Sequence, residues 1–154
     1  MIFVTHRLPV NGAGRPVLSR AMVWDGLVRK AGNALPFVPI MSRCEVTVRH
    51  SAQCFDRDIE IRGEAFTERV TLEEPHRVVF TRIAGPVLGT IANEIEGQGS
   101  HDLALRFSFA LVVGGVPGGS DAEAQTADRM TTDYLAAVTA TLDAVRRIAQ
   151  GETT

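Results

Sequence analysis

Residues 120–150 read SDAEAQTADRMTTDYLAAVTATLDAVRRIAQ. Ser120 and Glu123 have the spacing of a capping box, in which each side chain accepts a hydrogen bond from the other residue's backbone amide. Gly151 comes next and is a favoured residue just beyond a helix end. One side of the stretch carries mostly apolar residues at helical spacing: Met130, Tyr134, Ala137, Val138, Thr141, Leu142, Val145 and Ile148. This pattern predicts one amphipathic helix of about 45 Å, long enough to cross a whole sheet.

Ahead of this helix the hydrophobic pattern has a period of two, which is typical of strands. The alternation runs through residues 44–113. Within residues 56–64 every second residue is charged, so this side of the sheet must face water. Turn residues at Glu74-Pro75, Gly85-Pro86 and 97–100 separate the runs. The pattern therefore predicts successive hairpins in an antiparallel meander.

The N-terminal part predicts one strand and one helix. The strand covers residues 4–8, and a loop rich in Gly and Pro follows it. Ser19 has a side chain that commonly caps a helix N-terminus. The helix would run to about residue 31 with an apolar stripe formed by Val23, Trp24, Leu27 and Val28. Residues 35–40 hold too much proline for a full helix, so we expect a short turn or single helical turn that packs its Phe and Val inward.

Strand, helix, curved antiparallel sheet and long closing helix together describe an α+β cup with a helical lid. The chain has 154 residues, which suits a single domain over residues 1–154, and it contains no internal repeat. A cup closed by a helix suggests a cavity for a small molecule. The sequence contains no recognisable catalytic motif and therefore does not indicate a reaction. It does not determine the oligomeric state either.

Composition and charge exclude several classes of function. Charged residues make up 22% of the chain and the formal net charge is −2, with the basic residues scattered, so we expect no nucleic-acid partner. The N-terminus lacks the pattern of a signal peptide, and no apolar stretch approaches the roughly 20 residues that span a bilayer. Cys44 and Cys54 are predicted to lie apart and unbridged, which fits a reducing compartment and a cytoplasmic protein.

The expected strand pairing predicts a buried pair of opposite charges. If the turn at Glu74-Pro75 pairs Leu72 with Val78, then Glu68 faces Arg82 on the inner side of the cup. Charged groups that point into a core must be paired or hydrated. A shift of the turn by one residue would instead turn Arg82 outward.

The same pairing places Val70 opposite Phe80, and Asn93 would lie beside Phe80 on the following strand. Arg82 could then hold a ligand carboxylate or enolate, with Asn93 as a donor and Glu68 as its partner or a general base. The competing interpretation is an internal ion pair that only fixes the strands. Apolar residues would supply most of the affinity, namely Val70, Leu72, Phe80, Ile91, Phe107 and Tyr134.

A second polar candidate is His50 with Phe55 and Arg57 near the other end of the sheet. The pKa of a histidine lies near neutrality, so His50 could act as an acid or base. The alternative is a solvated residue at a strand end. No histidine pairs with Asp, Glu or Cys at a metal-ligand spacing, and we predict neither a metal nor another cofactor.

The predicted element order resembles the Bet v 1/START-like superfamily, also called SRPBCC, and is locally similar to its AtaL-like family. Residues along the whole chain carry the likeness: Ser19-Arg20, Val23-Trp24, Leu27, Phe37-Val38-Pro39, Arg57-Asp58-Ile59, Arg62-Gly63, Asn93-Glu94-Ile95-Glu96 and Leu103 to Phe109. The resemblance implies a helix-grip fold, in which a seven-stranded curved antiparallel sheet wraps around a long C-terminal helix, with one or two short helices after the first strand.

The superfamily mixes carriers of hydrophobic ligands, polyketide cyclases and other enzymes, so the fold does not choose among functions. Three functions remain open from the sequence. The first is a protein that holds a small hydrophobic molecule between the sheet and the C-terminal helix. The second is a cyclase or dehydratase acting on a polyketide-like metabolite, with Glu68 or His50 as acid or base. The third is a structural or interaction module with a filled core.

Overall fold

The structure, a computed structural model, describes residues 1–151 and contains seven strands and two α-helices. In chain order its elements are β1 (Ile2–Pro9), α1 (Arg20–Gly32), β2 (Met41–Ser51), β3 (Cys54–Ile61), β4 (Glu64–Glu73), β5 (Arg77–Ala84), β6 (Val87–Glu96), the 3₁₀ turn η1 (Ser100–Asp102), β7 (Ala104–Val113) and α2 (Asp121–Ala149).

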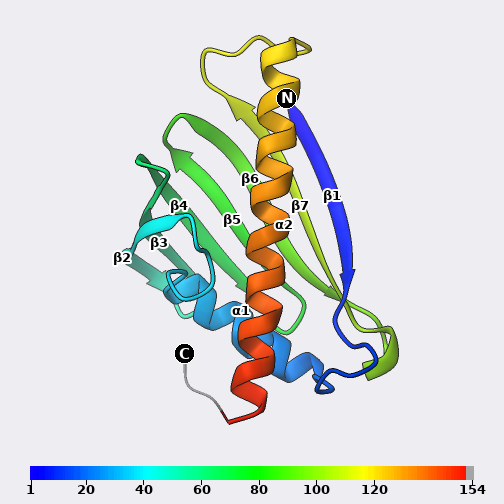
Figure 1. Cartoon of the computed structure of the whole chain (residues 1–154). Helices are drawn as coiled ribbons and strands as arrows, with labels where there is room; N and C mark the ends of the chain where they lie inside the picture. Colours follow the sequence, from blue (N-terminus) through cyan, green and yellow to red (C-terminus); the bar gives the residue numbers. More distant parts are fainter. Residues whose placement is uncertain (152–154) are drawn as a thin grey trace.

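All seven strands form one antiparallel sheet in the order β1-β7-β6-β5-β4-β3-β2. Figure 1 shows α2 running along the length of the sheet on its concave side, with α1 crossing near one end. The first strand closes the meander by pairing with the last, Ile2 opposite Leu111. The predicted helix-grip fold is confirmed, including the long closing helix and its bounds to within one residue.

The N-terminus of α2 is capped, but only half of the predicted capping box forms. The Ser120 Oγ accepts a hydrogen bond from the Glu123 amide at 3.2 Å. The Glu123 carboxylate accepts from the Gly119 amide at 3.0 Å, rather than from the Ser120 amide. Its other oxygen accepts from the N-terminal ammonium of Met1 at 2.9 Å, which ties β1 to the start of the long helix.

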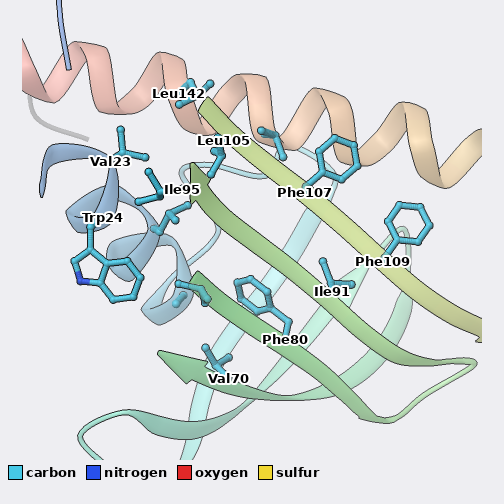
Figure 2. Close-up of a cluster of buried hydrophobic side chains, with 14 of the residues drawn as sticks. Val23, Trp24, Val70, Phe80, Ile91, Ile95, Leu105, Phe107, Phe109 and Leu142 are labelled. Carbon is cyan, nitrogen blue, oxygen red and sulfur yellow. The ribbon is translucent and has the colours of Figure 1, made fainter. Parts of the chain in front are cut away.

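The core fills the space between the sheet, α1 and α2. Figure 2 shows Val23 and Trp24 of α1 in the same buried cluster as Leu142 of α2 and the side chains that rise from the inner face of the strands. The two helices pack closely where Gly26 meets Val145, since a Cβ at residue 26 would overlap the Val145 side chain. Residues 35–37 form the expected turn, and the Phe and Val of this segment are buried as predicted.

Strand register confirms the pairing that the sequence indicates around Glu74-Pro75. Leu72 pairs with Val78, and Glu68 pairs with Arg82. The next pairing differs from the prediction, because β6 is displaced along β5 by two residues. Ile91, not Asn93, lies opposite Phe80, and Asn93 lies opposite Val78. Asn93 still points inward, because a shift by two residues preserves the face of the sheet.

Both cysteines are free, as predicted. Cys44 pairs with Ile59, whereas Cys54 pairs with Ser51 at the end of the hairpin. Neither helix within residues 1–151 is both long and apolar enough to cross a membrane.

Candidate functional site

A cavity of about 270 Å³ lies between the inner face of β3, β4, β5 and β6 and the long helix α2. Apolar side chains from these strands and from α2 form much of its wall: Ile59, Ile61, Phe66, Phe80, Ile91 and Met130. The turn before β2 adds Val38 and Ile40, and α1 contributes a single side chain, Lys30. The cavity therefore lies where the predicted lid meets the predicted cup.

One carboxylate, Glu68, lies at the buried side of this cavity between two arginines. Arg57 donates to its Oε1 from Nε at 3.0 Å and from Nη2 at 2.8 Å. Arg82 donates from Nε to its Oε2 at 3.3 Å. All three side chains are 4% exposed or less. Both Glu68 oxygens are thus occupied by charge-assisted hydrogen bonds.

Aromatic rings support both arginines from within the wall. The guanidinium of Arg57 lies 4.8 Å from the ring centroid of Phe80, and that of Arg82 lies 4.2 Å from the centroid of Phe66. At such distances a ring face attracts a cation, more strongly where water is excluded. The rings therefore hold the two guanidinium groups in place while presenting apolar surface to the cavity.

Arg57 also joins the sheet to α1. Its Nη1 donates to the backbone carbonyl oxygens of Lys30 at 3.0 Å and Ala31 at 2.9 Å. These carbonyls belong to the last turn of α1, whose C-terminal end carries partial negative charge and favours a nearby cation. Because of this contact, the position of α1 and the position of the buried charges depend on each other.

Tyr134 of α2 contacts the buried charged side chains from the helix side of the cavity. Its hydroxyl oxygen accepts a hydrogen bond from Arg82 Nη2 at 2.9 Å. Burial raises the pKa of the Tyr134 phenol to about 12, although the positive charge of Arg82 opposes this. The phenol therefore stays neutral at physiological pH and keeps its own proton to donate.

Lys30 is a residue of the candidate site that the sequence analysis did not predict. It is 7% exposed, lines the cavity, and donates from Nζ to Asn93 Oδ1 at 3.0 Å. Its pKa is lowered to about 8, mainly by burial and also by the charge of Arg57, while the charge of Glu68 offsets part of this effect. The helical spacing contained the signal, since residue 30 follows Leu27 by three and Val23 by seven and so falls on the apolar side of α1.

Charges at the mouth of the cavity are arranged differently from those inside. Arg62 forms an ion pair with Asp133 at 2.8 Å, which links the β3–β4 turn to α2. The pair is bidentate, because Arg62 also donates from Nε to the other carboxylate oxygen of Asp133 at 3.3 Å. Glu64 and Arg129 complete the charged residues of the lining at this end.

Most of the residues predicted from sequence line the cavity. The structure brings together Arg57, Glu68, Phe80, Arg82, Ile91, Asn93 and Tyr134. Three of the predicted apolar residues are not part of the lining. Val70 and Phe107 are fully buried in the core, and Leu72 is half-buried beside it. Phe107 still supports the site, because its ring lies 6.5 Å from that of Tyr134 in a stacked arrangement.

His50 lies outside the cavity, so its predicted grouping with Phe55 and Arg57 is wrong. Its Nε2 lies 3.0 Å from Asp56 Oδ2 on the outer face of the sheet. The register of β2 shifts between Val46 and Val48, as in a β-bulge, and this reverses the side on which later residues of the strand lie. Among residues 1–151 no group of three or more His, Cys, Asp or Glu side chains could hold a metal ion.

A curved seven-stranded sheet around a C-terminal helix, with a cavity between them, is the helix-grip fold of the START/Bet v 1-like superfamily. Within it, the model of the family described as acetylaranotin biosynthesis cluster protein L (AtaL) matches residues 4–152, and the chain belongs to this family. None of the curated proteins compared with the chain matches it.

Solved structures share the fold at low sequence identity. A START superfamily protein from Mycobacterium smegmatis superposes with a TM-score of 0.72 at 15% identity, over 96% of this chain and 99% of that one. The Zhui aromatase/cyclase from Streptomyces sp. R1128 has a TM-score of 0.69 at 15% identity, over 95% and 93% of the two chains. One part of the di-domain ARO/CYC StfQ from the steffimycin biosynthetic pathway has a TM-score of 0.68 at 13% identity, over 98% of this chain and 53% of that one.

Proposed function

We propose that the protein binds a small, largely apolar molecule in the cavity between β3–β6 and α2. The observation that carries this proposal is the cavity itself, about 270 Å³ of space inside what would otherwise be a packed core. Protein interiors rarely leave such space unfilled, because empty volume forfeits both hydrophobic and dispersion stabilisation. The cavity therefore speaks against the alternative of a structural module with a filled core.

The lining has the composition expected of a ligand site. Apolar and aromatic side chains supply area for burial, while a few polar groups converge on one side: Lys30, Arg57, Glu68, Arg82, Asn93 and Tyr134. Such a site gains affinity from the apolar area and orientation from the polar groups. Each of the polar groups is held by hydrogen bonds within the protein, so the site is preorganised before a ligand enters.

Filling the cavity tests this proposal. Replacing Ile91, which points from β6 into the cavity, with Trp should lower the affinity for hydrophobic ligands about tenfold or more by occupying their space. The matched control is Leu88→Trp on the exposed face of the same strand, which should leave binding unchanged. Native mass spectrometry of freshly purified protein, followed by denaturing extraction and dye-displacement titrations, measures the effect. Equal binding by both variants, or no binding of any hydrophobic molecule by the wild type, would refute a cavity ligand.

A cyclase-type enzyme is the second candidate, favoured by the amine of Lys30. The acid/base groups named from the sequence do not fit this role, since Glu68 is bound to two arginines and His50 lies outside the cavity. A buried amine with a pKa of about 8 is suited to proton transfer near neutral pH. The neutral amine would take a proton from carbon between two carbonyl groups of a ligand, leaving the electron pair on an enolate oxygen that Arg82 can stabilise.

Proton exchange on a bound 1,3-diketone tests the enzymatic alternative directly. In D₂O the protein should accelerate exchange at the central carbon of benzoylacetone about a hundredfold over buffer, followed by NMR. Lys30→Met should remove the acceleration, whereas Arg129→Met at the cavity mouth should retain it. Exchange that is equally fast with Lys30→Met would exclude proton transfer by this amine.

A further inference from the structure

The buried polar group of the cavity carries more positive than negative charge. Lys30, Arg57 and Arg82 are all at least nine-tenths buried, and Glu68 is the one carboxylate that they surround. With Lys30 protonated, the group has three positive charges against one negative charge. Uncompensated charge in a buried site costs several kcal/mol, so a structure retains it only where something repays that cost.

The mouth of the cavity does not offset this excess. Its lining carries two cations, Arg62 and Arg129, and two carboxylates, Glu64 and Asp133, which balance each other. Arg62 and Asp133 are moreover paired at 2.8 Å. The positive excess therefore belongs to the inner end of the cavity, where little water can screen it.

Two side chains of the buried group have hydrogen-bond donors that remain available to a ligand. The Lys30 ammonium has three N–H donors, and one of them is used by Asn93. The Tyr134 hydroxyl accepts from Arg82, and its own proton has no acceptor within residues 1–151. Both side chains line the cavity, so their free donors are available to a molecule bound there.

The amine at residue 30 is unusual for this chain, because every other strongly basic side chain is an arginine. Lys30 is the only lysine of the chain, against 15 arginines. An ammonium is a compact charge that can lose its proton when buried, whereas a guanidinium keeps its charge under all ordinary conditions. The only side chain of the protein that carries an amine on a long aliphatic stem thus lies in its cavity.

We propose that the ligand is an amphipathic anion, a carboxylate or enolate on an apolar body, whose charged oxygen is bound by Lys30 with help from Tyr134. This inference rests on the proposed binding function and narrows it to one chemical class. The apolar body lies against Phe66, Phe80 and Ile91, and the anion neutralises one of the excess positive charges of the buried group.

Binding of such an anion depends on pH in one direction. Lys30 must be protonated, and its pKa in the free protein is about 8, so affinity should be constant near pH 7 and fall about tenfold per pH unit well above pH 8. The groups that face Lys30 do not produce this change. Arg57 and Arg82 keep their charges, Asn93 does not titrate, Glu68 is held by both arginines, and the pKa of Tyr134 is about 12.

Pairs of acids and primary amides with the same apolar body test the inference. We would measure calorimetric affinities at pH 7 for benzoic, 2-naphthoic and decanoic acid and for their amides. The acid should bind about tenfold or more tightly than its amide in the best-fitting pair. Lys30→Met, which replaces a buried side chain with an apolar one of similar size, should abolish this preference and retain amide binding. Arg147→Met, which removes an exposed cation of α2 outside the cavity, should keep the preference.

The outcomes separate this inference from the proposed function. Equal affinity for acids and amides in the wild type would overturn the inference that the ligand is an anion. The cavity would then be a site for neutral ligands. Failure of every acid and amide to bind would overturn both. A preference for acids that survives in Lys30→Met would assign the anion to the arginines instead.

A measurement on the wild type guards against a variant that fails to fold. Because Lys30 is the only lysine, acetylation of its side chain can be followed by mass spectrometry as a function of pH. Bound 2-naphthoate should protect it and move the midpoint of its reactivity to higher pH, since an anion stabilises the ammonium. An unchanged midpoint with saturating 2-naphthoate would contradict direct binding at Lys30.

Discussion

Replacing Glu68 with Gln is expected to lower the free energy of unfolding by about 3–5 kcal/mol. Glu68 is 2% exposed and accepts three hydrogen bonds from Arg57 and Arg82. An amide keeps the shape of the side chain but leaves two buried guanidinium groups without a negative partner. The loss should therefore come from charge that is no longer compensated, not from a cavity. Denaturant unfolding followed by circular dichroism at pH 7 measures it.

Glu64→Gln is the matched control for this experiment. It makes the same substitution at the start of β4, where the side chain is exposed, and should change stability by no more than about 0.5 kcal/mol. A loss below about 1 kcal/mol for Glu68→Gln, with a native dichroism spectrum, would show that the two arginines do not depend on Glu68. The buried group would then have to be neutralised in some other way.

Replacing Gly89 with Ala is expected to cost about 3 kcal/mol of stability. Gly89 lies on β6 between Arg82 of β5 and Leu111 of β7, and its φ of 132° is one that residues with a side chain rarely adopt. An added Cβ would also overlap the backbone carbonyl oxygen of Ala110. Since that atom belongs to the neighbouring strand, relief requires β6 and β7 to separate. Thermal and denaturant unfolding measure the loss.

Gly12→Ala provides the comparison, because a Cβ there meets nothing within 4 Å and its φ is not positive. This variant should unfold at the wild-type midpoint. If Gly89→Ala did the same, the backbone of β6 would have to accommodate a side chain without moving β7. The close approach of the two strands beside Arg82 would then not be needed for the fold.

The buried ion group explains how this fold keeps charge beside an apolar cavity. Arg57 bridges from Glu68 to the last carbonyls of α1, and Arg82 bridges from Glu68 to Tyr134 of α2. A replacement of such a group by apolar residues is often neutral or stabilising in other proteins. Its retention here is consistent with a binding role for the charges, in addition to their role in joining both helices to the sheet.

Strand parity allowed much of the site to be predicted. Glu68 and Arg82 alternate in step with Val70 and Phe80, so their inward direction followed from the period of two once the turn was placed. The capped amphipathic stretch likewise predicted α2 and the inward direction of Tyr134. These predictions succeeded because each depends on contacts close in sequence.

Other features depend on contacts between distant segments and could not be predicted in the same way. A bulge in β2 turned His50 to the outer face, and no residue pattern in the strand marks its position. Asn93 lies opposite Val78 because of how the β5–β6 turn closes. Lys30 has a helical position that faces inward, but a lysine there could equally have extended its charge to water.

The sequence by itself determined the order of elements, the faces of the strands and the helix that closes the cup, because hydrophobic period and capping residues act locally. Only the tertiary structure decided which further side chains join the pair of Glu68 and Arg82 in one buried space. Arg57 from β3, Glu68 from β4, Arg82 from β5, Asn93 from β6 and Lys30 from α1 meet because the sheet curves around α2 and α1 packs across its end. Register and packing set these distances, and both result from the whole fold competing against other arrangements.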